Sequence, residues 1–308
     1  MKGTLQIRRQ IRSIGNTKKM TKAMELVSAA KMRKAIVAVL ATRPYATFAQ
    51  DVLRFLASRT VDASRHPLLE VRALRKAGFI VISTNRGLCG SFNATLASTV
   101  RHEVTRAKED GASSSEALSM GKRARDILAR SGLKISADFL KKDMTTSIID
   151  VLPLAHTIIE RYGKGNLDRV YVAYTDYISS VKQKPVCKQL LPLELGSGSV
   201  SQSESVPDPN SVLPSSEGRH KEFAGTLFEP SETQVLSYVI PRLLEVQLYQ
   251  AVLESEASEH SARMLAMHNA SEAATDILSE LRLAYNQIRQ AGITQEIAEI
   301  SSGRAALE

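Results

Sequence analysis

The hydrophobic residues of the chain follow helical spacing in two long segments, one near each end. In residues 4–57 these apolar positions are Ile7, Ile11, Ile14, Met20, Met24, Val27, Ile36 and Leu40. In the C-terminal segment they are separated by three, four or sums of these, at Leu243, Val246, Leu253, Met264, Met267, Ala274, Leu278, Leu281 and Ile288. This period predicts two long amphipathic helices. Pro44 and Pro241 are expected to kink or perturb them.

Between the helical segments, short apolar runs alternate with helical stretches. "AGFIVIST" at 77–84 and "SEALSM" at 115–120 are typical of buried strands, and a helical stretch follows each of them. Residues 145–165 are expected to form a third helix. The stretch 168–193 is expected to form two strands in a hairpin. The alternation predicts a Rossmann-like α/β layer domain with at least one antiparallel edge strand.

The length of the C-terminal helix determines how the two long segments are arranged. Some sixty-five residues after Pro241 would form a rod of roughly 95 Å at about 1.5 Å per residue. A compact domain of about a hundred residues has a radius of gyration of only about 13 Å, so it cannot cover such a rod. The predicted partner is the N-terminal helix, in an antiparallel two-helix coiled coil interrupted by the α/β domain. The predicted divisions are 1–57 for the N-terminal helix, 70–195 for the α/β domain, 196–225 for a flexible loop and 231–308 for the C-terminal helix.

The predicted seam of this coiled coil contains many polar residues. Those near positions that a strict zipper would fill with leucine are Thr17, Thr21, Ser28, His260, Arg263, Asn286 and Gln290. One polar seam residue usually fixes register, whereas many indicate a coiled coil that also lies inside another assembly.

Residues 196–222 differ from the rest of the chain in composition. They are rich in serine, glycine and proline and contain almost no large apolar residue, which predicts a flexible surface loop. Helical signals return at "EPSETQ", where Ser231 is expected to be the N-cap of the C-terminal helix.

Charge and cysteine content narrow the possible partners and compartment. The 308 residues carry a net charge of +9, and "NTKKMTKAMELVSAAKMRK" at 16–34 is a strongly basic predicted helix. This favours an acidic partner. Cys89 and Cys187 lie far apart, which indicates a reducing compartment without a disulfide framework. No run of eighteen apolar residues occurs, and no signal or transit segment is recognisable at Met1, so a cytoplasmic protein is expected.

The candidate chemistry is weak. "NRGLCGSFN" at 85–93 follows a strand and opens a helix, but it lacks the ending of a P-loop and the third glycine of a dinucleotide fingerprint. A tight turn in which only Gly87 and Gly90 fit is the preferred interpretation. We expect no catalytic residues, no metal ligands and no cofactor. Cys89 is expected to be a packing residue, and Met20 and Met24 are expected to belong to a core.

Two expectations concern polar side chains. The six histidines form no metal-like cluster in the sequence. Glu254, Glu256 and Glu259 are most simply a solvated helix face.

Two further hypotheses stay open at this point: a nucleotide-dependent α/β enzyme that uses "NRGLCGSFN", and a basic coiled-coil protein that binds nucleic acid.

The two ends of the chain carry a specific resemblance. "IRRQIRSIGNTKKMTKAMELVSAAKMRKA" and the segment from "SEHSARMLAMHNASEAATDIL" to "YNQIRQAGITQEIAEISSGRAAL" closely resemble the terminal helices of gamma subunits of rotary ATP synthases. "STNRGLCGSFN", "KQLLPLEL" and "LFEPS" are similar to motifs in the middle of that family. The resemblance covers nearly the whole chain.

The resemblance implies a rotor shaft that performs no bond chemistry. The paired termini would stand inside a hexamer of alpha and beta subunits, and the α/β domain would lie against the epsilon subunit and the membrane ring of c subunits. Proton flow would turn the ring and the shaft, which would force the catalytic beta sites through different conformations. The chain would bind neither nucleic acid nor nucleotide directly. The basic helix would turn past acidic segments of the beta subunits.

The resemblance also implies which residues contact the beta subunits. Arg289 and Gln290, in "RQAGIT", match the pair that engages the beta catch loop, and Thr294 and Glu296, in "ITQE", belong to the same region. Met24 in "TKAME" and Arg263 in "SARM" match positions that face the stator lower on the shaft.

Two features of the sequence bear on regulation and location. Residues 196–222 contain no cysteine, so the thiol regulation of chloroplast relatives is not expected. The N-terminal motif looks bacterial, which indicates a peripheral protein on the cytoplasmic face of a bacterial plasma membrane. The matrix side of the mitochondrial inner membrane is the alternative.

The composition of the 196–222 segment leads to a first prediction. Replacing it with a short Gly/Ser bridge is expected to leave the thermal midpoint within a few degrees, because it offers almost no apolar area to bury. Circular dichroism melting of the full-length and shortened chains checks this. A large loss of stability would show that the segment is packed against the rest of the chain.

Overall fold

The computed structural model describes residues 2–59, 66–131, 133–145, 147–193, 229 and 231–305. The chain divides into two compact units, the first made of Met1–Ala29 and Arg263–Glu308 and the second of Ala30–Ala262. Two long helices, α1 (Lys2–Arg59) and α6 (Glu232–Ala305), each contribute to both units. The predicted flexible loop at 196–222 lies outside the described residues.

A five-stranded sheet forms the centre of the second unit, with the order β3-β2-β1-β4-β5. Its strands are β1 (Lys76–Ile82), β2 (Ser114–Met120), β3 (Lys134–Phe139), β4 (Arg169–Tyr177) and β5 (Gln183–Leu191). The first four strands are parallel, and β5 pairs antiparallel with β4. The predicted Rossmann-like layer with an antiparallel edge is therefore confirmed. Sequence reasoning missed β3, a half-buried edge strand without a continuous apolar run.

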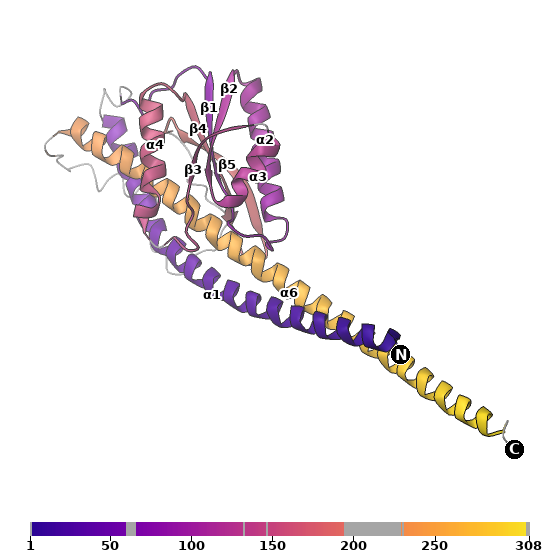
Figure 1. Cartoon of the computed structure of the whole chain (residues 1–308). Coiled ribbons are helices and arrows are strands. Elements are labelled where there is room, and N and C mark those ends of the chain that lie inside the picture. The colour runs from indigo at the N-terminus through magenta and orange to yellow at the C-terminus, as the bar shows by residue number, and fades with distance from the viewer. Residues whose placement is uncertain are drawn as a thin grey trace. The chain divides into compact units, whose positions relative to one another are not determined.

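Helices cover both faces of the sheet (Figure 1). On one face, α2 (Phe92–Glu109) and α3 (Lys122–Ser131) pack through Leu96, Val100 and Leu128 against residues such as Phe79 and Val81 of β1. On the other face, α4 (Leu152–Gly163) and the first half of α6 pack against the sheet. Both faces of β1 are buried, which explains the uninterrupted apolar run in its sequence.

The helix predicted at 145–165 is shorter than expected. The α-helix begins at Leu152, after a single 3-10 turn, η2 (Ile148–Asp150). Pro153 lies in the first turn of α4, where the missing N–H of proline costs nothing. Thr145 therefore stands outside the helix, and its backbone N–H is available for another contact.

The first half of α6 belongs to the core of the sheet domain, by which we mean the five-stranded sheet with α2, α3 and α4. The side-chain oxygen of Ser231 accepts a hydrogen bond from the N–H of Gln234 at 3.3 Å, so the predicted N-cap is confirmed. Ile240, Leu244 and Leu248 then lie in the same apolar cluster as Ile80 and Ile82 of β1 and residues of α4. The sheet domain and the C-terminal helix thus share one core.

The two long helices pack together and run antiparallel, as predicted (Figure 1). In the second unit, Ala35 and Val39 of α1 cluster with Leu253 and Ala257 of α6. In the first unit, a carboxylate oxygen of Glu25 lies 3.3 Å from Nδ1 of His268. Pro44 and Pro241 lie inside helices that continue through them, so neither proline ends a helix.

The buried face of α1 agrees with the predicted polar seam at Thr21 and Ser28 and departs from the predicted apolar positions at Met20 and Val27. Met20 is 57% exposed and Val27 is also exposed, whereas Thr21 and Ser28 are buried. The expectation that Met20 is a core residue is wrong, and Met24 is only half-buried. Small polar side chains occupy these seam positions because they let the partner helix approach closely, and Thr21 Oγ1 satisfies itself by donating to the carbonyl of Lys18.

The C-terminal end of α6 extends past the N-terminus of α1 (Figure 1). Leu278 is the last buried residue in the described part of this helix, and every residue from 286 to 302 is exposed. Nothing in the described part of the chain covers this end of the helix.

The turn between β2 and α3 leads to a second prediction. Gly121 has a φ of +100°, and a Cβ added there would lie 2.6 Å from the carbonyl oxygen of Ser83. Gly121→Ala is therefore expected to lower the free energy of unfolding by about 1–3 kcal/mol or more, because strain and overlap add. Urea unfolding of the isolated chain measures this loss.

Gly87→Ala serves as the matched control for this substitution. Its φ lies outside the left-handed region, and the nearest neighbour of an added Cβ is a side-chain nitrogen of Arg123 at 3.8 Å. Equal unfolding midpoints for the two variants would contradict the prediction.

Candidate functional site

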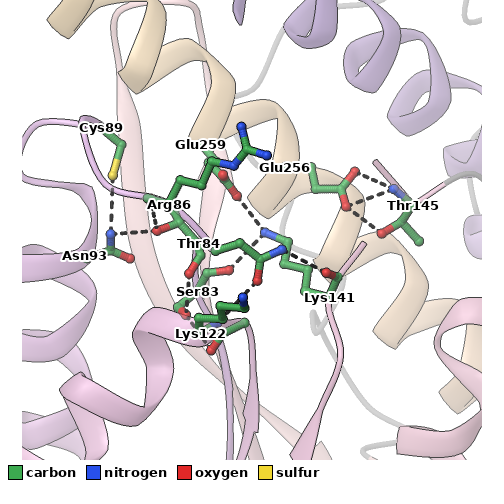
Figure 2. Close-up of polar contacts among 12 residues, drawn as sticks. Ser83, Thr84, Arg86, Cys89, Asn93, Lys122, Lys141, Thr145, Glu256 and Glu259 are labelled. Carbon is green, nitrogen blue, oxygen red and sulfur yellow. Dashed lines mark hydrogen bonds and ion pairs between the residues drawn. The ribbon is translucent and has the colours of Figure 1, made fainter. Parts of the chain in front are cut away.

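The carboxyl ends of the parallel strands converge on a buried polar cluster. In doubly wound sheets the crevice outside these ends is where ligands bind. Here Lys141, just after β3, directs its ammonium group into this region (Figure 2). Its Nζ donates to the carbonyl oxygen of Ser83 at 3.0 Å, just after β1, and to Oε2 of Glu259 on α6 at 2.7 Å. A side chain of the chain's own C-terminal helix thus contacts the loops at the carboxyl ends of the strands.

A second contact joins α6 to the same loop. The backbone N–H of Thr145 donates to both carboxylate oxygens of Glu256 at 3.0 Å, and the hydroxyl of Thr145 donates to one of them. Glu256 is only 1% exposed. Burial raises the pKa of Glu256, and the nearby Lys141 ammonium and the Thr145 hydrogen bonds act against that rise. We refer to Ser83, Lys141, Thr145, Glu256 and Glu259 as the α6 latch.

The expectation that Glu254, Glu256 and Glu259 form a solvated helix face is wrong. All three are buried, because every residue of α6 from 251 to 261 is enclosed between the sheet domain and α1. One sequence signal could have revealed this. Between Arg242 and Arg263 the chain has four glutamates but no lysine or arginine, whereas a solvated face usually alternates both signs of charge.

Breaking the Lys141–Glu259 pair of the latch would destabilise the fold. The side chains of Lys141 and Glu259 are 2% and 9% exposed, so both charges have left bulk water. Removing one partner of such a buried pair typically costs about 3–5 kcal/mol, since the other charge stays buried without compensation. Replacing both by apolar residues is often neutral or stabilising. The pair is therefore better explained by directional specificity than by net stability.

The segment at 85–93 forms a tight turn whose polar groups bond to one another. The side-chain amide of Asn93 donates to Thr84 Oγ1 at 2.8 Å and to Sγ of Cys89 at 3.3 Å. Gly90 has a positive φ, as expected, but so does Leu88. Gly87 has room for a Cβ, so the expectation that only glycine fits there is wrong. The burial expected for Cys89 is confirmed.

Other reactive groups are arranged for packing. Burial raises the pKa of Cys187 to about 12, so its thiol stays protonated at neutral pH. Within the ranges that the structure describes, no three histidine, cysteine, aspartate or glutamate side chains are grouped so that they could hold a metal ion. In the same ranges, no helix combines the length and hydropathy of a membrane span.

The six predicted contact residues lie in different environments within the first unit. Arg289, Gln290, Thr294 and Glu296 are all exposed on the last part of α6. They fall within one helical stretch, where Thr294 Oγ1 donates to the carbonyl of Gln290 at 2.9 Å. Met24 is half-buried on α1, and Arg263 is buried on α6. The structure therefore groups four of the six on one exposed segment.

Comparisons with known proteins agree with this fold. A family model described as "ATP synthase" matches residues 4–307. The ATP synthase gamma chains of Herpetosiphon aurantiacus and Roseiflexus castenholzii are each 40% identical to the chain, over 100% of its length and 99% of theirs.

Solved structures share the architecture at lower identity. The rotor structure of Euglena gracilis mitochondrial ATP synthase aligns with a TM-score of 0.60 at 20% identity, covering 94% of this chain and 99% of that one. The central stalk and c-ring structure from Tetrahymena thermophila aligns at 0.58 and 22% identity, covering 82% and 99%. These two likenesses show the fold.

The matches define a class of protein, the central-stalk rotor subunits of F-type ATP synthases. Within that class, the chain belongs to the ATP synthase gamma chain family. It is a non-catalytic subunit of a complex that makes ATP from a proton gradient. The two other hypotheses from the sequence, a nucleotide-dependent enzyme and a nucleic-acid-binding coiled coil, are thereby replaced.

Glu254, which lies next to the latch, leads to a third prediction. Burial and the nearby Asp176 raise its pKa. A carboxyl whose pKa is higher in the folded chain than in the unfolded one stabilises the fold below the unfolded pKa, near 4.5, and this contribution is lost as pH rises. Glu254→Gln is therefore expected to flatten the decline in unfolding free energy as the pH rises above the unfolded pKa.

Urea unfolding at several pH values measures this slope. Glu160→Gln is the control. Glu160 lies on α4, and its hydrogen bond from Lys164 lowers its pKa. Removing this carboxyl group therefore cannot flatten the same decline. An unchanged pH slope in Glu254→Gln would show that Glu254 does not hold its proton in the folded chain.

Proposed function

We propose that α6 and α1 turn inside a hexamer of alpha and beta subunits, while the sheet domain contacts the epsilon subunit and the membrane ring of c subunits. In this arrangement the helices at 1–57 and 231–308 form the shaft. The domain at 70–195 receives torque from the ring. The segment at 196–225 joins this domain to the C-terminal helix as a loop. The shaft changes the conformation of the catalytic beta subunits without binding nucleotide itself.

One observation carries the proposal: the exposed end of α6. Ile288, Ile293, Ile297 and Ile300 on this single helix are 42%, 49%, 62% and 74% exposed. A lone helix in water is stable mainly when its apolar side is covered, so this end calls for an outside partner that surrounds it. A ring of subunits around the shaft would cover all sides of the helix.

The charge of the N-terminal helix supports the same arrangement. Lys19, Lys22, Arg33 and Lys34 are exposed on α1. Basic side chains on a turning shaft suit acidic segments of a surrounding subunit, because complementary charge guides association without a fixed geometry. Like the curated relatives, which come from bacteria, the chain is proposed to act at the cytoplasmic face of a bacterial plasma membrane as a peripheral protein. The matrix side of the mitochondrial inner membrane is the alternative.

We assign the contact with the beta catch loop to Arg289 and Gln290, with Thr294 and Glu296 beside them. The exposure of all four supports this assignment. Met24 and Arg263 are assigned to the stator contact lower on the shaft. Co-expression with alpha and beta subunits, followed by purification through a tag on this chain and identification of the subunits by mass, tests the assembly itself.

The assignment of Arg289 and Gln290 leads to a fourth prediction. A charge-assisted hydrogen bond to the catch loop would contribute roughly 1.5–3 kcal/mol, enough to shift the balance between open and closed beta states about ten- to a hundred-fold. Arg289→Ala with Gln290→Ala is expected to lower the ATPase rate of the assembled complex. Helicity and melting of the isolated chain should remain nearly unchanged, because both side chains are exposed.

Arg282→Ala provides the control on the same helix, since Arg282 is exposed but lies outside the predicted contact set. Steady-state ATP hydrolysis and single-molecule torque are measured on complexes of equal composition. Full turnover and full torque in the double variant would place Arg289 and Gln290 among ordinary surface residues.

A further inference from the structure

The α6 latch holds the helix at two points on one side. Glu256 and Glu259 are three residues apart, which separates them by about 4.5 Å along the helix axis and about 60° around it. Each makes its own contact, Glu256 with Thr145 and Glu259 with Lys141 (Figure 2). A helix held in this way can neither slide nor rotate without losing at least one of the contacts.

The loop that carries Lys141 and Thr145 is itself fastened on several sides. The side-chain amide of Asn85 donates to the carbonyl of Lys141 at 2.8 Å. Asp143, between them, lies 3.5 Å from the guanidinium of Arg86 and 3.5 Å from Nζ of Lys31 on α1. A force on α6 therefore reaches the end of β1 and the N-terminal helix through this loop.

The rest of the contact between α6 and the sheet is apolar. Leu244, Leu248 and Val252 pack in the core beside the strands. Hydrophobic burial is non-directional, so it stabilises the contact without selecting one rotation of the helix strongly. Hydrogen bonds depend steeply on distance and angle, so the latch supplies the directional part of this contact.

We propose that the α6 latch is the contact through which torque passes between the sheet domain and the shaft. Lys141, Thr145, Glu256 and Glu259 are positioning residues that keep α6 in one rotational register under load. The inference rests on the proposed function, in which the sheet domain meets the rotor ring and α6 meets the beta subunits. Loss of the latch lets the helix slip, so ATP hydrolysis continues while fewer protons are pumped for each ATP.

The test uses the complete ATP synthase in sealed vesicles, with ATP hydrolysis and ATP-driven proton pumping measured together. Lys141→Met removes the ammonium group and leaves Glu259 buried without it. If loss of this ammonium group makes the native rotational register of α6 and a slipped register equally populated, the number of protons pumped per ATP falls about twofold. Lys141→Met combined with Glu259→Leu replaces both charges by apolar side chains, which is expected to restore thermal stability but not the pumping ratio.

Leu248→Ala is the control, because Leu248 is a fully buried core residue of α6 that belongs to none of the latch contacts. It is expected to lower the melting temperature while the pumping ratio stays normal. If Lys141→Met fails to assemble, the double variant carries the test. A double variant that assembles and pumps with the normal ratio would overturn the inference. Failure of the unmodified chain to assemble or pump would instead overturn the proposed function.

Discussion

The structure depends on one constraint: the apolar side of a helix of 74 residues must be covered, by this chain or by a partner. The chain meets this constraint differently in different parts of α6. Near Leu244 the sheet and α4 cover it, and near Ala257 the N-terminal helix lies against it as well. Farther along, in the first unit, α1 is its partner. From residue 286 to residue 302 the described chain offers no cover at all. This last stretch is the part of the chain that we propose to contact the surrounding subunits.

The enclosed part of α6 explains why a Rossmann-like sheet can serve a protein without catalytic chemistry. The carboxyl edge of such a sheet has backbone groups and loops that bind ligands in many proteins. Here Glu259 of α6 accepts a hydrogen bond from Lys141, and Glu256 accepts hydrogen bonds from Thr145, at this edge. At this edge of the sheet the contacts therefore fix the position of a helix of the same chain.

Polar groups are placed where orientation matters, and apolar groups where stability matters. Apolar side chains form the clusters around Phe79 and Ile80 on the two faces of the sheet. Buried charges gather at the contacts of α6 with the sheet domain, where Glu254, Glu256 and Glu259 lie. A buried ion pair often adds little net stability over an apolar pair, so we attribute to the latch the selection of one arrangement of α6 against neighbouring ones.

The sequence by itself determined the two long helices, four of the five strands, the N-cap at Ser231 and the family. Those features rest on local periodicity, on capping chemistry and on motifs that are continuous in the chain. Only the tertiary structure showed that Met20 and Val27 are exposed, and that Glu256 and Glu259 are buried. The partners of these glutamates, Thr145 and Lys141, lie more than a hundred residues earlier in the chain. Helical spacing tells which residues share a face, but it cannot tell how many neighbours enclose that helix, because burial is decided by segments that are distant in sequence.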